Sequence, residues 1–232
     1  MIALLAAAAT AAASALPGAA ATPAPLAPAA VVAKYAAALA ALKEPRVFAV
    51  EYTLEQTGTR TLDQTHRIFR SGGDERDETL AVNGNRSVRP VVRIFRKRPY
   101  RYAVRALAPK PAVYAFAYAG PHRDGKHVDY VFDLMPKGAR GAITFTRVTI
   151  DGVTFLPSTV AFATNAHGGK GTVTFKKSST WWVAAGATAS ARVPGGVAHE
   201  RLSFLRWRFP PSLPPSTFSL PRPLPTPPPA AP

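Results

Sequence analysis

After Pro45 the chain alternates apolar and polar residues with a period of two, and this alternation constrains the fold more than any other feature. The first run places on one face Phe48, Val50, Tyr52 and Leu54. Turn dipeptides separate the later runs, among them Asp151-Gly152 and Gly195-Gly196. Short strands joined by such turns are typical of an antiparallel meander. The expected strands are 48–54, 66–70, 88–96, 100–107, 112–119, 127–135, 142–151, 154–164, 171–177, 180–193 and 197–209.

One helix is predicted ahead of the strands. Val32, Tyr35, Leu39 and Leu42 recur every three or four residues in AAVVAKYAAALAALK, and Pro45 ends the run. Long meanders close or partly close to hide their edges. The expected fold class is therefore mainly β (α+β): a curved antiparallel sheet forming an incomplete β-barrel, with the N-terminal helix packed on its concave side.

The ends of the chain differ in composition from the middle. Residues 1–21 are uncharged and rich in alanine, which predicts a signal peptide and an exported, soluble, periplasmic or otherwise extracytoplasmic product. Residues 22–30 are an expected Ala/Pro linker, 31–220 one half-barrel domain, and 221–232 a proline-rich disordered tail. The chain has no cysteine, which excludes disulfides, thiolate chemistry and a lipidated cysteine anchor.

Aromatic residues gather on one face of the expected sheet. They are Phe48, Tyr52, Tyr102, Tyr114, Phe116, Tyr118, Tyr130 and Phe132. One interpretation is a closed core filled by these rings. The other is a half-barrel that leaves an apolar cavity, in which the same residues bind a lipid-like ligand.

The opposite face of one expected strand is basic. In RKRPYRYAVRALAP the aromatics alternate with arginines, and the basic residues of the segment are Arg96, Lys97, Arg98, Arg101 and Arg105. The formal net charge of the whole chain is +16. These residues either solvate the outer face of the sheet or dock an anionic partner such as a membrane surface. No nucleic-acid partner is expected, and the oligomeric state stays open.

Sequence patterns for catalysis are weak, so the chain is not expected to be an enzyme and no cofactor is expected. The five histidines are scattered, and GxSxG, HExxH, P-loop and GxGxxG motifs are absent. The segment HRDGKHVD groups His122, Asp124, His127 and Asp129, but an Asp-Gly turn accounts for it and no metal site is predicted. Asp133 and Asp151 are interpreted as a surface charge and a turn residue.

Read in order, several segments resemble the LolA-like outer-membrane lipoprotein-sorting proteins. They are VVAKYAAALAAL, FAVEYTLEQTG, KRPYRYAVRALAP and DYVFDLMPKGARGAITFTRVTIDGVTFLPSTVAF, and the match spans about residues 30–220. The resemblance implies an extracytoplasmic incomplete barrel with helical lids and a cavity for acyl chains. It also implies a ligand-gating arginine, for which Arg70 and Arg93 are candidates by strand position.

The resemblance implies a function for the whole chain. It would be a lipid- or lipoprotein-binding carrier or sensor, with an acyl-chain lipid or a lipidated protein as partner. The segment between Pro109 and Tyr130 is shorter than in that family, which implies a reduced lid. The alternative is a non-enzymatic envelope interaction protein with a filled core that docks anionic membrane or partner surfaces.

Overall fold

The structure is a computed structural model that describes residues 26–124, 127–139, 141–165 and 167–220. The predicted signal peptide and the predicted proline-rich tail lie outside the described residues. The predicted linker is described only from residue 26 onward, and its last three residues already belong to the first helix.

Eleven strands and three short helical segments make up the described part of the chain. The helical segments are α1 (Pro28–Ala41), α2 (Val104–Leu107) and the 3-10 turn η1 (Pro215–Phe218). The strands are β1 (Val47–Thr57), β2 (Leu62–Ser71), β3 (Asp74–Val82), β4 (Asn85–Phe95), β5 (Tyr114–Asp124), β6 (His127–Pro136), β7 (Ile143–Asp151), β8 (Pro157–Thr164), β9 (Lys170–Ser178), β10 (Trp181–Val193) and β11 (Gly196–Arg208).

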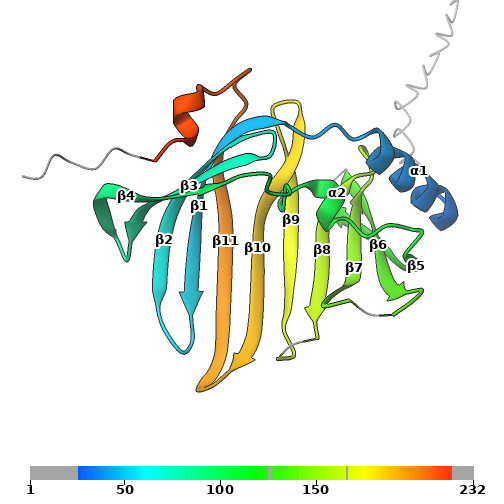
Figure 1. Ribbon diagram of the computed structural model, residues 1–232. Helices are drawn as coiled ribbons and strands as arrows, with labels where there is room; N and C mark the ends of the chain where they lie inside the picture. The colour runs from blue at the N-terminus through cyan, green and yellow to red at the C-terminus, as the bar shows by residue number, and fades with distance from the viewer. Residues whose placement is uncertain (1–25, 125–126, 140, 166, 221–232) are drawn as a thin grey trace, which may run out of the picture.

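The strands form one antiparallel sheet in the order β4-β3-β2-β1-β11-β10-β9-β8-β7-β6-β5. The chain builds one half outward from β1 to β4, crosses the face of the sheet, and builds the other half from β5 back to β11. β11 then pairs with β1 and joins the halves. Figure 1 shows the crossing segment passing in front of the strands, through α2, to the far edge.

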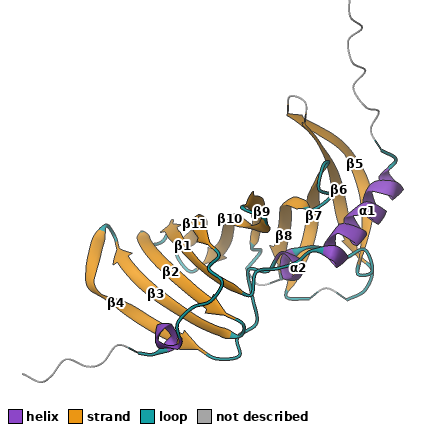
Figure 2. Ribbon diagram, turned by 90° about the horizontal axis from the view of Figure 1, so that it is seen from above, coloured by secondary structure: helices purple, strands orange, loops and turns teal. Residues whose placement is uncertain are grey.

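The sheet is bent and stays open, as the sequence predicts. Seen from above, its strands follow an arc, and both α1 and α2 lie on the concave side (Figure 2). β4 and β5 are the two edges and do not pair with each other. The expected curved sheet with an N-terminal helix on its concave side is therefore confirmed.

Helix α1 follows from its composition. Pro28 lies in its first turn, where a missing N–H costs nothing, and a run of alanines continues the helix. Val31 and Tyr35 are fully buried against the sheet, whereas Val32, Leu39 and Leu42 pack at the margin. Among the described residues, α1 and the shorter helices fall short of the length and apolarity that a membrane-spanning helix requires.

Strand β3 has no counterpart among the predicted strands, because charged residues interrupt its alternation. Its sequence DERDETLAV turns Glu75 and Asp77 toward the concave side, opposite Arg70 and Ile68 of β2. An inward carboxylate is stable there because a buried arginine on the neighbouring strand balances it.

The prediction of a strand over 100–107 is wrong. Residues 96–113, here called the strap, connect β4 to β5 across the concave face and contain only the short helix α2. Tyr100 and Tyr102 pack on the core, but against side chains of the sheet rather than as members of it. The apolar–basic alternation of this segment reflects a connection that packs on one side and meets solvent on the other.

Candidate ligand pocket on the concave face

The concave face has three zones that differ in how they are filled. Under α1, three aromatic rings are in contact. The ring centroids of Tyr35 and Phe116 lie 5.7 Å apart, and those of Phe116 and Phe132 lie 5.8 Å apart. Over β2 and β3 the face is polar. Between these zones, over β9, β10 and β11, it is apolar and open. The open zone is the candidate ligand site.

An open pocket of about 260 Å³ occupies the middle zone. Its floor consists of concave-facing residues of five strands: Leu54, Phe162, Val173, Ala187, Ala189, Leu202 and Phe204. The strap contributes Tyr102 and Leu107 as a wall, with Arg101 at the side. The pocket is therefore framed by the sheet and by the connection that crosses it.

Small residues on β10 create this space. The strand contains the run AAGATASA over 184–191, and Ala184, Gly186, Ala187 and Ala189 all line the pocket. The alanine and glycine side chains on β10 are too small to fill this volume, whereas leucines or aromatic residues fill the corresponding volume on neighbouring strands. The run is visible in the sequence, and it is the pattern that predicts this pocket better than the aromatic alternation does.

The polar zone fastens the strap to the sheet. The Arg70 guanidinium bonds the Glu75 carboxylate at 2.9 Å and donates to the Arg98 carbonyl oxygen of the strap at 2.6 Å. Arg98 in turn bonds the second oxygen of Glu75 at 2.7 Å. The side chains of Arg70 and Glu75 are 5% and 4% exposed, so low-dielectric surroundings strengthen both contacts.

The far end of the strap is held by α1. The Tyr35 hydroxyl donates to the Pro109 carbonyl oxygen at 2.8 Å, and both groups are buried. Burial raises the pKa of Tyr35 far above its ordinary value, so the hydroxyl stays a donor. The Arg105 guanidinium donates to the Ala40 and Leu42 carbonyl oxygens at the end of the helix.

His66 lies beside the polar zone. Its ring stacks on Tyr52 at 4.7 Å, with Nδ1 3.2 Å from Asp77 and Nε2 3.2 Å from Gln64. Burial, with the nearby Asp77 carboxylate, raises the pKa of Tyr52. These polar partners are satisfied within the sheet, which makes the group a packing element of the concave face.

The eight aromatic residues predicted to line a cavity take different positions. Of these, Tyr102 lines the open pocket. The buried ones, Phe48, Tyr52, Tyr114, Tyr130 and Phe132, belong to the packed core, and Phe116 packs against it. Tyr118 is 38% exposed near the β5 edge. Most of these rings therefore fill the core, and one of the eight borders the pocket.

The predicted basic strand face, Arg101 and Arg105 with Arg96, Lys97 and Arg98 at its edge, does not form, because these residues do not lie on a strand. Arg96 pairs with Asp74, Arg98 with Glu75, and Arg105 binds the end of α1. Lys97 occupies a turn position with φ of 52°. Arg101 is exposed at the side of the concave pocket. Their roles differ because they lie on the strap rather than on a strand.

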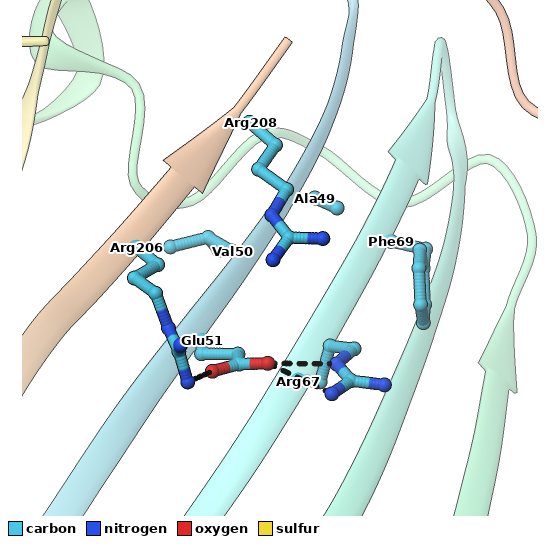
Figure 3. Close-up of a pocket in the computed structure, with 7 residues that line it drawn as sticks. All are labelled: Ala49, Val50, Glu51, Arg67, Phe69, Arg206 and Arg208. Carbon is cyan, nitrogen blue, oxygen red and sulfur yellow. Dashed lines mark hydrogen bonds and ion pairs between the residues drawn. The ribbon is translucent and has the colours of Figure 1, made fainter. Parts of the chain in front are cut away.

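A second, charged pocket of about 130 Å³ lies on the other face of the sheet (Figure 3). There the Glu51 carboxylate lies between Arg206 and Arg67, and Arg67 is 2.8 Å away. Burial tends to raise the pKa of Glu51, but the hydrogen bonds from the two guanidinium groups outweigh it and lower the pKa. Arg208 points into the same pocket, which gives it a positive balance.

Comparison with known proteins finds solved structures that resemble this chain at low sequence identity. The sequence matches no family model and no curated protein. A LolA superfamily protein from Nitrosomonas europaea superposes with a TM-score of 0.44 at 11% identity, over 83% of this chain and 97% of that one. An outer membrane lipoprotein-sorting domain from Vibrio parahaemolyticus gives 0.45 at 14% identity, over 81% and 95%. A DUF1329 family protein from Desulfovibrio piger gives 0.45 at 12%, over 82% and 97%.

Proposed function

We propose that this chain is an exported, non-enzymatic carrier or sensor that holds one acyl chain of a lipid or lipidated protein in the concave pocket. The open apolar floor between two filled zones supports the proposal most directly. An apolar surface in contact with water is unfavourable. A hydrocarbon chain that displaces this water is stabilised by about 0.8 kcal/mol for each buried methylene. Export rests on the apolar segment 1–21.

The pocket volume limits the ligand. At about 260 Å³ it falls just below the range of about 300–1,000 Å³ typical of small-molecule sites. One chain, or part of one, fits this space, whereas a bundle of chains does not. The remainder of a longer ligand would extend past Arg101 and Glu200 at the margin of the pocket.

Filling the pocket tests the proposal. Ala187 lies on the pocket floor, so Ala187→Phe should occupy it with a ring and lower the affinity for a fluorescent single-chain fatty acid at least about tenfold, or 1.4 kcal/mol. Phe116→Ala is the matched control, because Phe116 packs under α1 and does not line the pocket. Equal binding by wild type and Ala187→Phe, or an absence of saturable binding, would contradict the proposal.

The charged pocket favours a second function, docking on an anionic bilayer. Three guanidinium groups there face one carboxylate, and Arg206 is 67% exposed in its side chain. Each exposed basic residue near such a membrane contributes about 1 kcal/mol, and salt screens the attraction. The surface proposed for docking is therefore Arg67, Arg206 and Arg208.

Co-sedimentation with anionic and zwitterionic vesicles distinguishes this second function from a solvated surface. Replacing Arg206 and Arg208 together by glutamine should reduce binding to anionic vesicles at low salt. Replacing Lys43 and Lys110, two exposed lysines near α1 and on the strap, removes the same charge elsewhere and should leave that binding unchanged. Equal losses in the two variants would mean that only net charge matters.

A further inference from the structure

Two carboxylates face each other where β6 begins and β7 ends. Asp129 and Asp151 are register partners in the β6–β7 pair, so their side chains leave the sheet on the same side. Each side chain is only 14% exposed. Like charges directly opposite each other on adjacent strands are destabilising, and partial burial increases the repulsion. A positive charge between the two groups would relieve this repulsion.

His127 supplies a nitrogen at that position. Its Nε2 lies 2.8 Å from Asp129 Oδ1 and 3.0 Å from Asp151 Oδ2. His127 precedes Asp129 by two residues on the same strand, so both side chains project from one face. The three ligand atoms lie within 4.8 Å of one another. Nitrogen and carboxylate oxygens of this kind are the ligands that zinc and similar cations use in proteins.

The hydrogen bonds around the cluster leave two oxygens for a cation. Asp151 Oδ1 accepts from the backbone of Val153 and from both the backbone and hydroxyl of Thr154, which closes the turn after β7. Asp151 Oδ2 faces His127 instead. Asp129 Oδ1 is enclosed, yet it has no hydrogen-bond donor despite the short distance to Nε2. An enclosed carboxylate oxygen without a donor is uncommon and points to a missing partner.

We propose that His127, Asp129 and Asp151 bind a divalent transition-metal ion such as Zn²⁺. With metal–ligand bonds of about 2.0–2.1 Å, the observed nitrogen–oxygen separations correspond to angles of about 90° at the metal. His127 is 43% exposed, so further ligands can reach the metal from solvent. The metal neutralises both carboxylates and gives Asp129 Oδ1 its partner.

The sequence separates the members of this site. The segment HRDGKHVD brings His127 and Asp129 together, but an Asp-Gly turn explains that pattern by itself. Asp151 joins only because the β6–β7 register places it opposite Asp129. The structure thus adds Asp151, from outside the segment, as a third ligand. Its Oδ1 already accepts hydrogen bonds in the turn, and its Oδ2 faces His127.

Isothermal titration tests the site. The full chain, without a histidine tag and after treatment with chelator, should bind one equivalent of Zn²⁺ and bind Ca²⁺ at least tenfold more weakly, because a histidine nitrogen suits zinc and not calcium. His127→Gln and Asp129→Asn should each weaken Zn²⁺ binding at least about tenfold. Zn²⁺ should raise the melting temperature of the wild type and not that of His127→Gln.

His199→Gln is the matched control, because it removes an exposed histidine on β11 without touching the cluster. It should bind Zn²⁺ as the wild type does. The proposal is overturned if the wild type shows no saturable Zn²⁺ binding. Unchanged binding in His127→Gln would overturn it equally, and that variant is expected to fold because the side chain is partly exposed.

Discussion

Buried charge at the polar zone is where single residues matter most to this fold. Arg70 and Glu75 are almost fully enclosed, and Arg98 of the strap shares the same carboxylate. A buried ion pair adds little net stability over apolar residues, but removing one partner leaves a charge without compensation. These residues therefore determine the position of the strap more than they increase the free energy of unfolding.

Glu75→Ala tests that role. We expect a loss of about 3–5 kcal/mol in the free energy of unfolding, because Arg70 would stay buried without its carboxylate. The matched control is Asp133→Ala, which breaks the Asp133–Arg147 pair, where both side chains are at least half exposed. That change should cost far less, because water and salt screen an exposed pair. Similar small losses in urea unfolding of the two variants would contradict the assignment.

A pH dependence follows from Glu51. Its pKa in the folded protein is lower than the ordinary value of 4.5, despite burial, because Arg67 and Arg206 hydrogen-bond the ionised form. Its contribution to stability is therefore present above the ordinary pKa and lost as the pH falls through the folded pKa. Between pH 6 and pH 3 the free energy of unfolding should fall less steeply in Glu51→Gln than in wild type. Parallel curves would contradict this.

At the scale of elements, the alternation of side chains predicts most of the sheet and misses two segments for physical reasons. β1, β2 and β6 follow directly from their apolar faces. Alternation does not predict β3, because its inward positions carry carboxylates that a neighbouring strand balances. The strap has the sequence pattern of a strand, because its tyrosines pack on the core and alternate with exposed arginines. The position of the pocket is harder to predict, because the strap that walls it and Leu54 of β1 are distant in sequence from the strands β8 to β11 that form the rest of its floor.

The tie between α1 and the strap makes an element-scale prediction. Tyr35→Phe removes the hydroxyl that donates to the buried Pro109 carbonyl oxygen, so the free energy of unfolding should fall by about 1–3 kcal/mol. Strap amides should also exchange hydrogen faster. Tyr118→Phe, at an exposed tyrosine, is the control and should change neither quantity measurably. A Tyr35→Phe variant indistinguishable from that control would show that the strap is held elsewhere.

At the scale of the whole molecule, an open arc of strands leaves different amounts of space along one face. α1 and the aromatic rings fill the β5–β8 side, ion pairs fill the β2–β3 side, and the small residues of β10 leave the centre open. Because the strap crosses this centre, the same segment that joins the halves of the sheet also borders the pocket. A connection of this kind couples the ligand site to the integrity of the sheet.

Phe116→Ala separates the filled zone from the open one. Phe116 lies against Tyr35 and Phe132, so its truncation should cost about 3 kcal/mol of unfolding free energy, the lower end for a core phenylalanine because it is only partly buried. Ala187→Phe should cost less, because the ring enters open space. Chemical denaturation of both variants checks the order. A reversed order would mean that the β10 region is the packed one.

The central claim is that the concave pocket holds an acyl chain, and mass spectrometry of organic extracts from the purified protein tests it most directly. The account predicts an acyl-chain lipid in wild-type extracts, retained in Phe116→Ala and depleted in Ala187→Phe. Extracts without any acyl lipid, or with equal amounts from wild type and Ala187→Phe, would contradict it.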